Sequence, residues 1–303
     1  MLHSVIKYIR LAYIFLKWWF FELFTRGQSD SLACLVGKTA IVTGGNRGIG
    51  FAICTLLASR GCRVIIADVA DSEASRKKII EHTGNTNIFT KQLDLSSLQS
   101  VRKFASEIIK DEKKIDILVN NAGIGRPTQK YTQDGLNTVM QVNIFGPFLL
   151  THLLIGPLKA ANGARVVFTG SSMALLSKLT LENMSQRLNR LKYEFKITTG
   201  FDPGMVRTNL LYEPNAYMTG IAGVIFRNLS ILVIISYIFG QSPFDGAQTS
   251  FHVASKEKLK ESGKHFHRCR LFAKPKVLQD EKFCDEVWKS IEEFVKLRPE
   301  EQI

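Results

Sequence analysis

The chain has 303 residues, of which 45% are hydrophobic, and this is enough to bury one large core. Its formal net charge of +13 suits nucleic acid, anionic lipid or a phosphorylated cofactor, but no DNA- or RNA-binding motif accompanies the charge, so lipid is favoured over nucleic acid. The five cysteines are scattered without a Cys-x-x-Cys pair, which argues against a secreted disulfide framework and for a protein facing the cytosol.

Residues 1–26 are apolar and aromatic, and Lys7, Arg10 and Lys17 interrupt them. They contain no uncharged stretch of about 18 residues, which a spanning helix needs, and no small-residue cleavage site of a signal peptide. Aromatic side chains mixed with basic ones predict a helix that lies in the membrane interface. A helix packed on the protein's own surface is the alternative. Residues 27–36 are expected to be a linker to a domain over 37–298, followed by a short tail over 299–303.

A glycine-rich turn follows the first predicted strand, which begins at residue 38. The turn runs Thr43-Gly44-Gly45-Asn46-Arg47-Gly48-Ile49-Gly50, and the apolar pattern of a helix follows it over 51–58. Glycines let the backbone approach a pyrophosphate, whose charge then meets the helix N-terminus. The order strand, turn, helix therefore predicts a dinucleotide site, and a turn without a ligand is the alternative. The residues expected to contact the cofactor are Thr43, Gly44, Asn46, Arg47, Gly48, Ile49 and Gly50.

A second buried strand over 63–68 ends in Asp68, which lies 18 residues past Gly50. This is close to the spacing of about 20 residues at which a carboxylate meets the adenosine ribose hydroxyls. A carboxylate there repels a 2′-phosphate and favours NAD, whereas Arg47 in the turn favours NADP. Both cofactors remain open, with NAD favoured because the end of the strand is the selective position.

Further strands are expected at 88–94, 115–119, 165–169, 196–201 and 265–267, with helices at 71–83, 98–110, 142–158 and 283–295. Strands that alternate with helices predict an α/β fold, a single Rossmann-like doubly wound parallel sheet of about seven strands with helices on both faces. Residues 217–244 are very apolar but slightly short of a membrane span. A substrate lid that contacts the membrane is favoured there over a membrane dip or a core helix. No metal site is predicted at His265 and His267, which lie on the last expected strand.

The turn over 43–50, the tetrapeptide Asn120-Asn121-Ala122-Gly123, Asn143 and the pair Pro203-Gly204 together resemble the short-chain dehydrogenase/reductases, over residues 36–298. The tail resembles the retinol-dehydrogenase-like branch of that family. The resemblance implies an NAD(P)(H)-dependent oxidoreductase acting on alcohol and carbonyl groups of lipophilic, retinoid- or steroid-like substrates.

The resemblance also implies roles for individual residues. Asn143 would hold a catalytic Lys through water, and Ser171 would orient the substrate, with Ser172 as the fallback. Asp94 and Leu95 would contact the adenine edge, and Asp94 could also cap the helix over 98–110. The remaining cofactor contacts that it implies are Asn121, Ala122, Gly123, Pro203, Gly204, Val206 and Thr208.

One part of the family pattern is absent, namely a Tyr followed four residues later by a Lys on the helix after Ser171. In this chain only Tyr13 and Lys17 have that spacing, and they precede the cofactor strand. Ser171 and Pro203 are only 32 positions apart, less than in the family. General acid–base catalysis typically contributes about 10²–10⁴-fold, so we expect cofactor binding with impaired turnover. Tyr193 is not expected to substitute.

Two alternatives stay open: a catalytically silent scaffold or sensor that uses the cofactor pocket, and an unstable splice product. The expected partners are a lipophilic small molecule and membrane lipid, at the cytosolic face of the endoplasmic reticulum or a lipid droplet. A homodimer is in doubt, because family members pair through the helices that flank the missing segment.

Overall fold

The computed structural model describes residues 27–125, 127–161, 163–170, 201–202, 241–256, 259, 262–272 and 279–301. The helix expected over 1–26 lies outside these ranges. So do Ser171, Ser172, the shortened segment before Pro203, and all of the apolar stretch over 217–244 except its last four residues. Within the described ranges, no helix combines the length and the apolarity that crossing a membrane requires.

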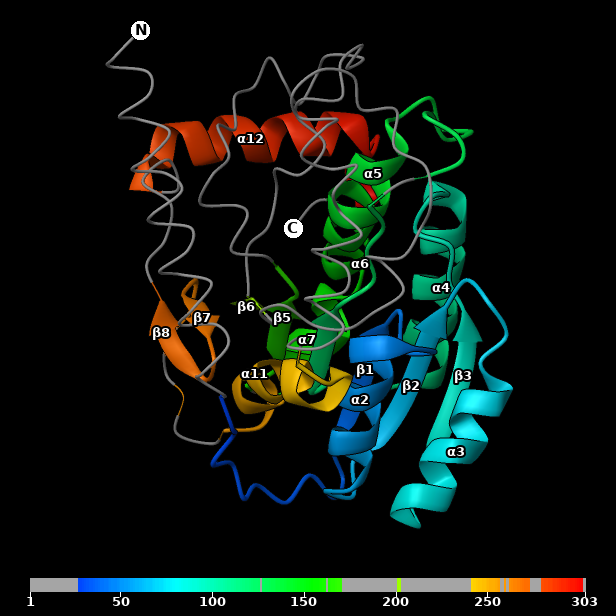
Figure 1. The fold of residues 1–303 in the computed structure, drawn as a ribbon. Coiled ribbons are helices and arrows are strands. Elements are labelled where there is room, and N and C mark those ends of the chain that lie inside the picture. Colours follow the sequence, from blue (N-terminus) through cyan, green and yellow to red (C-terminus); the bar gives the residue numbers. More distant parts are fainter. Residues whose placement is uncertain are drawn as a thin grey trace, which may run out of the picture.

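The centre of the fold is a five-stranded parallel sheet with the order β3-β2-β1-β4-β5 (Figure 1). Its strands are β1 Thr39–Thr43, β2 Arg63–Asp68, β3 Ile88–Gln92, β4 Ile117–Asn120 and β5 Arg165–Phe168. The order reverses at β1, which pairs with β2 on one side and with β4 on the other. In open parallel sheets a ligand site forms at such a reversal, outside the carboxyl ends of the strands.

Helices cover both faces of this sheet, as expected. They are α2 Gly48–Ala58, α3 Glu73–Thr83, α4 Leu98–Asp111, α5 Thr138–Met140, α6 Gly146–Leu153, α7 Ile155–Ala160, α11 Pro243–Ser255 and α12 Glu281–Phe294. Along β1, Ala40 and Val42 face the core beneath α2 and α11, whereas Ile41 faces the core beneath α4 and α6. This two-residue period divides the apolar side chains between two cores, one on each face (Figure 1).

The described residues of the sixth and seventh predicted strands, which include only Phe201 of the range 196–201, do not pair with the five-stranded sheet. Within the described residues, β6 Phe201–Asp202 pairs in parallel with β7 His265–His267, and β7 pairs antiparallel with β8 Arg270–Phe272. The expected single sheet of about seven strands is therefore divided into five strands and a separate group of three. The division arises because both residues of β6 take their partners from β7.

The long helix expected over 142–158 is interrupted twice. A π-helical turn, Gln141–Phe145, precedes α6, and the chain leaves helical geometry at Leu154. Proline explains both positions, because its ring lacks an N–H and clashes with the carbonyl four residues earlier. Pro147 removes the bond to residue 143 inside the π turn, and Pro157 removes the bond to residue 153 at the break.

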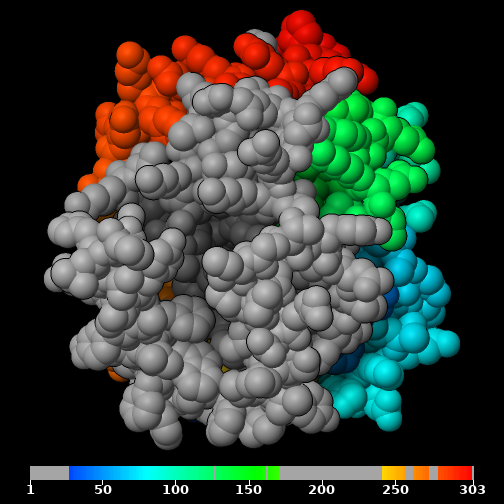
Figure 2. All heavy atoms as spheres, turned by 45° about the horizontal axis from the view of Figure 1, so that its top comes forward, coloured from blue at the N-terminus to red at the C-terminus, as the bar shows by residue number. Residues whose placement is uncertain are grey.

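The closing helix α12 packs across α6. The Phe145 and Phe294 ring centroids are 5.1 Å apart, and Phe148 meets Trp288 edge-on at 4.7 Å. Ile291 and Val295 of the predicted helix are buried, whereas Trp288 is 49% exposed. In the space-filling view, the surface of α12 (orange to red) adjoins the green surface of residues 131–160 (Figure 2).

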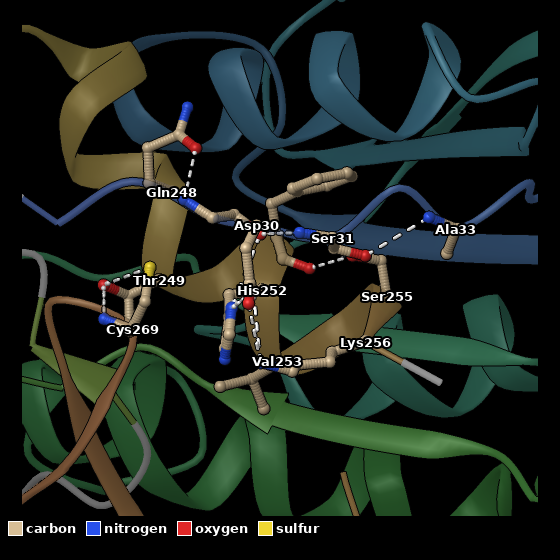
Figure 3. A network of polar contacts seen from close by, with 12 residues as sticks. Asp30, Ser31, Ala33, Gln248, Thr249, His252, Val253, Ser255, Lys256 and Cys269 are labelled. Atoms are coloured by element: carbon tan, nitrogen blue, oxygen red, sulfur yellow. Dashed lines mark hydrogen bonds and ion pairs between the residues drawn. The ribbon is translucent and has the colours of Figure 1, made fainter. Parts of the chain in front are cut away.

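Residues 27–36, expected as a linker, lie along α11. The Ser29 N–H donates to Gln248 Oε1 at 3.2 Å, and the Ser255 hydroxyl donates to Ser31 Oγ at 2.8 Å (Figure 3). The segment is therefore bound to the body of the domain before it enters β1.

Candidate cofactor site

The turn between β1 and α2 is packed so closely that it needs its glycines. Gly44 has a φ of +65° and Gly48 a φ of +58°, values that residues other than glycine rarely adopt. A Cβ on Gly50 would lie 2.0 Å from the Gly44 carbonyl oxygen and 2.6 Å from Asn121 Nδ2. One on Gly44 would lie 2.9 Å from Ala122 Cα. The turn is thus pressed against the loop that follows β4.

The N-terminus of α2 is free to receive an anion. Arg47 precedes the helix, no side chain caps its first turn, and that turn contains no acidic residue. The first N–H groups of a helix have no partner inside the helix, and a phosphate can accept their hydrogen bonds. Together with the glycines of the turn, which have no Cβ, this fits the pyrophosphate of NAD(P), which the N–H groups at the start of α2 would hold.

Asp68 lies at the carboxyl end of β2 and faces the turn. Its Oδ2 accepts the Asn46 N–H at 3.2 Å and its Oδ1 accepts the Ala70 N–H at 3.1 Å. The Asn46 side-chain amide reaches across to the Asp71 carbonyl oxygen at 3.1 Å. The predicted closeness of Asp68 and the turn is therefore present, while the Arg47 side chain is exposed beside them.

A hydrogen-bonded brace joins the ends of β1, β4 and β5. Thr43 Oγ1 accepts the N–H groups of Asn121 and Ala122 at 2.9 and 3.0 Å. The Asn121 amide donates to the Thr43 carbonyl oxygen at 3.0 Å, and its Oδ1 accepts the Thr169 hydroxyl at 3.3 Å. The brace fixes the turn over the sheet edge at which a ligand is expected.

Two residues of the brace region were not predicted. Thr169 follows β5 at the same carboxyl edge as Thr43, a position that could have identified it. Ser75, in the first turn of α3, donates to the Asn46 carbonyl oxygen at 2.6 Å and ties α3 to the glycine turn. No local pattern marks Ser75, because its partner is 29 residues away.

Asn143 occupies the π-helical turn, where its side chain binds the backbone of Ile124 in both directions. Its Oδ1 accepts the Ile124 N–H at 2.9 Å, and its Nδ2 donates to the Ile124 carbonyl oxygen at 3.0 Å. The side chain therefore holds the loop after Gly123, and a Cβ on Gly123 would lie 3.5 Å from Asn143 Oδ1.

Asp94 does not cap α4. The cap is Ser97, whose Oγ accepts the Ser100 N–H at 3.2 Å, whereas Asp94 Oδ1 accepts the N–H and the hydroxyl of Ser96. Asp94 lies three residues too early to reach the free N–H groups of the helix, because a capping side chain binds two or three residues ahead. The Leu95 side chain is buried in the core beneath α6, so only its backbone remains for a cofactor contact.

Beneath the turn, Cys54 fills the space that a Cβ on Gly45 would enter, with its Sγ 3.0 Å from that position. Burial raises the pKa of the Cys54 thiol, so this cysteine is a packing residue and not a nucleophile. Ser171, Pro203, Gly204, Val206 and Thr208 lie outside the described residues, so the structure places only the nucleotide side of the predicted site.

A sequence profile of the short chain dehydrogenase family matches residues 38–215. Human retinol dehydrogenase 13 is 33% identical over 291 positions, covering 87% of this chain and 86% of that protein. Bovine retinol dehydrogenase 12 is 34% identical over 280 positions, covering 82% and 83%. Among solved structures, a putative uncharacterized protein from Mycobacterium paratuberculosis has a TM-score of 0.63 at 22% identity and covers 90% of this chain and 98% of its own. A short chain dehydrogenase from Shigella flexneri 2a, complexed with NADP, has a TM-score of 0.57 at 20% identity, covering 78% and 99%. These two structures support the fold.

The alignment with human retinol dehydrogenase 13 has more positions than this chain has aligned residues. It spans 291 positions, whereas 87% of 303 residues is about 264 residues, so about 27 positions face a gap in this chain. The glycine turn, Asp68 and the brace all lie within the range that the profile matches. The chain therefore belongs to the short-chain dehydrogenase/reductase family of NAD(P)-dependent oxidoreductases and is similar to its retinol-dehydrogenase-like branch.

Proposed function

We propose that this chain binds NAD(P)(H) as members of its family do but turns over alcohol and carbonyl substrates poorly. The proposal rests on a contrast between the residues of the cofactor site, which are present, and the catalytic Tyr and Lys, which the sequence lacks. The turn, its brace and Asp68 lie together as a nucleotide site requires, whereas no Tyr after residue 26 is followed four residues later by a Lys. A bound nicotinamide supplies hydride transfer, and the chain must supply the proton at the substrate oxygen.

The Tyr and Lys of the family are expected to supply that proton. The Lys charge favours the phenolate and lowers the Tyr pKa, and both side chains lie on one face of a helix. Two observations support the loss of that helical segment. About 27 positions of the alignment with human retinol dehydrogenase 13 have no residue in this chain, and Ser171 and Pro203 are only 32 positions apart. We place the loss between Ser185 and Gln186. Exon skipping explains it better than gradual drift, and a longer transcript with Tyr-x-x-x-Lys at this point is the expected finding.

NAD is the proposed cofactor in preference to NADP. Asp68 is held by two backbone N–H groups, so its carboxylate remains at the strand end where the adenosine ribose is expected. A fixed negative charge at that place repels a 2′-phosphate. Arg47 is exposed at the helix cap and opposes this preference only weakly, because an exposed side chain is screened by solvent.

The proposed substrates of the intact protein are lipophilic alcohols or carbonyls of retinoid or steroid type, as the names of the related retinol dehydrogenases suggest. The aromatic and basic residues 1–26 would bind membrane lipid on the cytosolic side, at the endoplasmic reticulum or a lipid droplet. Formation of a homodimer through the shortened helix is not proposed.

The test combines two assays. NADH is titrated into the protein while quenching of the intrinsic fluorescence reports binding, and turnover is measured separately with retinol and steroid alcohols. Saturable quenching, cooperative melting and turnover at least about 10²-fold below an active relative are expected. Turnover at the rate of the relative would overturn the proposal. Quenching without any turnover would identify the silent sensor, and melting without cooperativity would identify an unstable product.

A further inference from the structure

One edge of the domain presents apolar side chains to solvent. Leu32 is 86% exposed and Val36 is 72% exposed, and Cys34 between them is also exposed. The residues that alternate with them are buried. An extended segment therefore has one face in the protein and one apolar face outside it. Three neighbouring apolar side chains of this kind commonly mark an interaction site.

This segment cannot turn its outer face inward, because its inner face is hydrogen-bonded to two helices. Ser31 Oγ accepts the Ser255 hydroxyl of α11 at 2.8 Å (Figure 3). At the end of α2, Arg60 Nη2 donates to the Ser31 carbonyl oxygen at 3.2 Å, and the Arg60 carbonyl oxygen accepts the Leu35 N–H at 2.8 Å. The exposed side chains are thus held in a fixed orientation.

Basic residues surround the exposed segment. It lies where the parallel strands begin, in the lower part of Figure 1, where the blue trace passes beneath α11 to reach β1. The acidic side chains there are paired: Asp30 with Lys256 at 3.0 Å, Glu112 with Arg63 at 2.8 Å, and Asp116 with Lys38 at 2.9 Å. Two lysines at this edge have no ion pair among the described residues: Lys113, in the loop that precedes β4, and Lys159, near the end of α7.

We propose that this edge, called here the amino-end face (residues 30–38 with Lys113 and Lys159), rests on an anionic lipid bilayer. The occupant follows from two observations: the surrounding charge is positive, and the aromatic, basic residues 1–26 end six positions before Leu32. This inference rests on the proposed membrane association and not on the proposed loss of turnover. Because the cofactor turn lies at the opposite, carboxyl ends of the strands, it faces away from the bilayer, and this placement is an alternative to the membrane contact expected of residues 217–244.

Cys34 allows a direct test in the full-length chain. Cys54 and Cys62 are buried, and burial raises the pKa of each thiol, so neither competes for labelling. Cys269 and Cys284 are replaced by Ser, and an environment-sensitive fluorophore is attached to Cys34. The control carries the label at the opposite edge, as Val69→Cys with Cys34→Ser, since Val69 is 59% exposed. The membranes are phosphatidylcholine vesicles with and without phosphatidylserine.

On anionic vesicles, the emission maximum of the label at Cys34 is expected to shift to shorter wavelength, and brominated lipid is expected to quench it. The label at position 69 is expected to stay exposed to water and to show neither effect. Leu32→Ser with Val36→Ser is expected to weaken vesicle binding about tenfold or more. Lys113→Glu with Lys159→Glu is expected to weaken binding to anionic vesicles, at about fivefold per charge. The matched control, Lys77→Glu with Lys78→Glu on α3, is expected to change it little.

Two results would overturn the proposal that the amino-end face contacts the bilayer: vesicle binding while the label at Cys34 stays exposed to water, and equal quenching of the two labels. No vesicle binding at all would overturn the membrane association together with it, while the NADH titration would still report on the cofactor site. A blue shift at Cys34 that depends on protein concentration without vesicles would also overturn it, because a second copy of the chain would then cover the face.

Discussion

Asn121 donates two hydrogen bonds to Thr43. The Asn121 N–H donates to Thr43 Oγ1 at 2.9 Å, and the Asn121 side-chain amide donates to the Thr43 carbonyl oxygen at 3.0 Å. The same Thr43 oxygen accepts the Ala122 N–H. One buried hydroxyl therefore links the glycine turn to the loop after β4, and the shape of the nucleotide cradle depends on it.

Replacing Thr43 by Val is expected to lower both stability and cofactor affinity. The change keeps the shape but leaves two N–H groups without an acceptor, at a cost of about 1–3 kcal/mol each where water cannot enter. The melting temperature should fall and the Kd for NADH should rise. Thr55→Val is the matched control, because the Thr55 hydroxyl donates only to the Phe51 carbonyl oxygen within α2. Equal effects of the two changes would contradict the role of the brace.

Replacing Gly50 by Ala is expected to abolish NADH quenching. The new Cβ would meet the Gly44 carbonyl oxygen at 2.0 Å, so the turn must move away from α2. Overpacking of this kind costs about 1–3 kcal/mol of folding free energy. Gly156→Ala is the control, since nothing lies within 4 Å of a Cβ there and Ala favours the helix. Unchanged NADH binding by the Gly50 variant would show that the cradle is not the site.

Replacing Asp68 by Asn is expected to shift cofactor preference towards NADPH. Asn keeps the size of the side chain but removes the charge that repels a 2′-phosphate. The ratio of the NADPH and NADH dissociation constants should change by about tenfold, which corresponds to about 1.4 kcal/mol. Asp71→Asn removes the same charge from a neighbouring exposed position and serves as the control. A ratio that responds to both changes alike would indicate a general field effect and not a contact.

The ion pair that fastens the end of the chain to α4 predicts a pH dependence of stability. Arg102 holds Glu301 with two bonds, at 2.7 and 2.9 Å, and also donates to the Val295 carbonyl oxygen at 3.1 Å. Burial opposes ionisation of Glu301, but the hydrogen bonds from Arg102 and from the Arg298 N–H outweigh it and hold the pKa of this carboxyl below its ordinary value.

Because the folded pKa is depressed, the stabilisation is complete above the unfolded value of about 4.3 and is lost as the pH falls through the folded pKa. Glu301→Gln should therefore lower the melting temperature at neutral pH, and the difference from the parent should shrink in acid. Thermal melts between about pH 7 and about pH 3 measure this directly. Glu73→Gln removes a carboxylate from a more exposed pair with Arg76 and should change little.

The strands of the parallel sheet could be predicted from the sequence because each one is marked by a contiguous run of residues. The apolar, β-branched runs predicted at 63–68, 88–94, 115–119 and 165–169 became strands of nearly the predicted length. The glycine turn was predicted for the same reason, since strand, turn and helix are contiguous. Asp68 was found from spacing, because the end of the second strand necessarily lies beside the end of the first.

What sequence could not predict depends on partners distant along the chain. The side-chain hydrogen bonds of Asn143 are made with Ile124, nineteen residues earlier, and the cap of α4 required a choice between Asp94 and Ser97 that only geometry decides. The attachment of residues 27–36 to α11 joins positions more than 200 residues apart. Periodicity reports on burial but does not identify such partners.

The most direct measurement compares this chain with one in which the aligned segment of human retinol dehydrogenase 13 is inserted between Ser185 and Gln186. NADH affinity and turnover of retinol are measured for both. The account predicts similar NADH dissociation constants and turnover at least about 10²-fold higher in the restored chain. Equal turnover in the two proteins, or NADH binding that appears only after restoration, would contradict it.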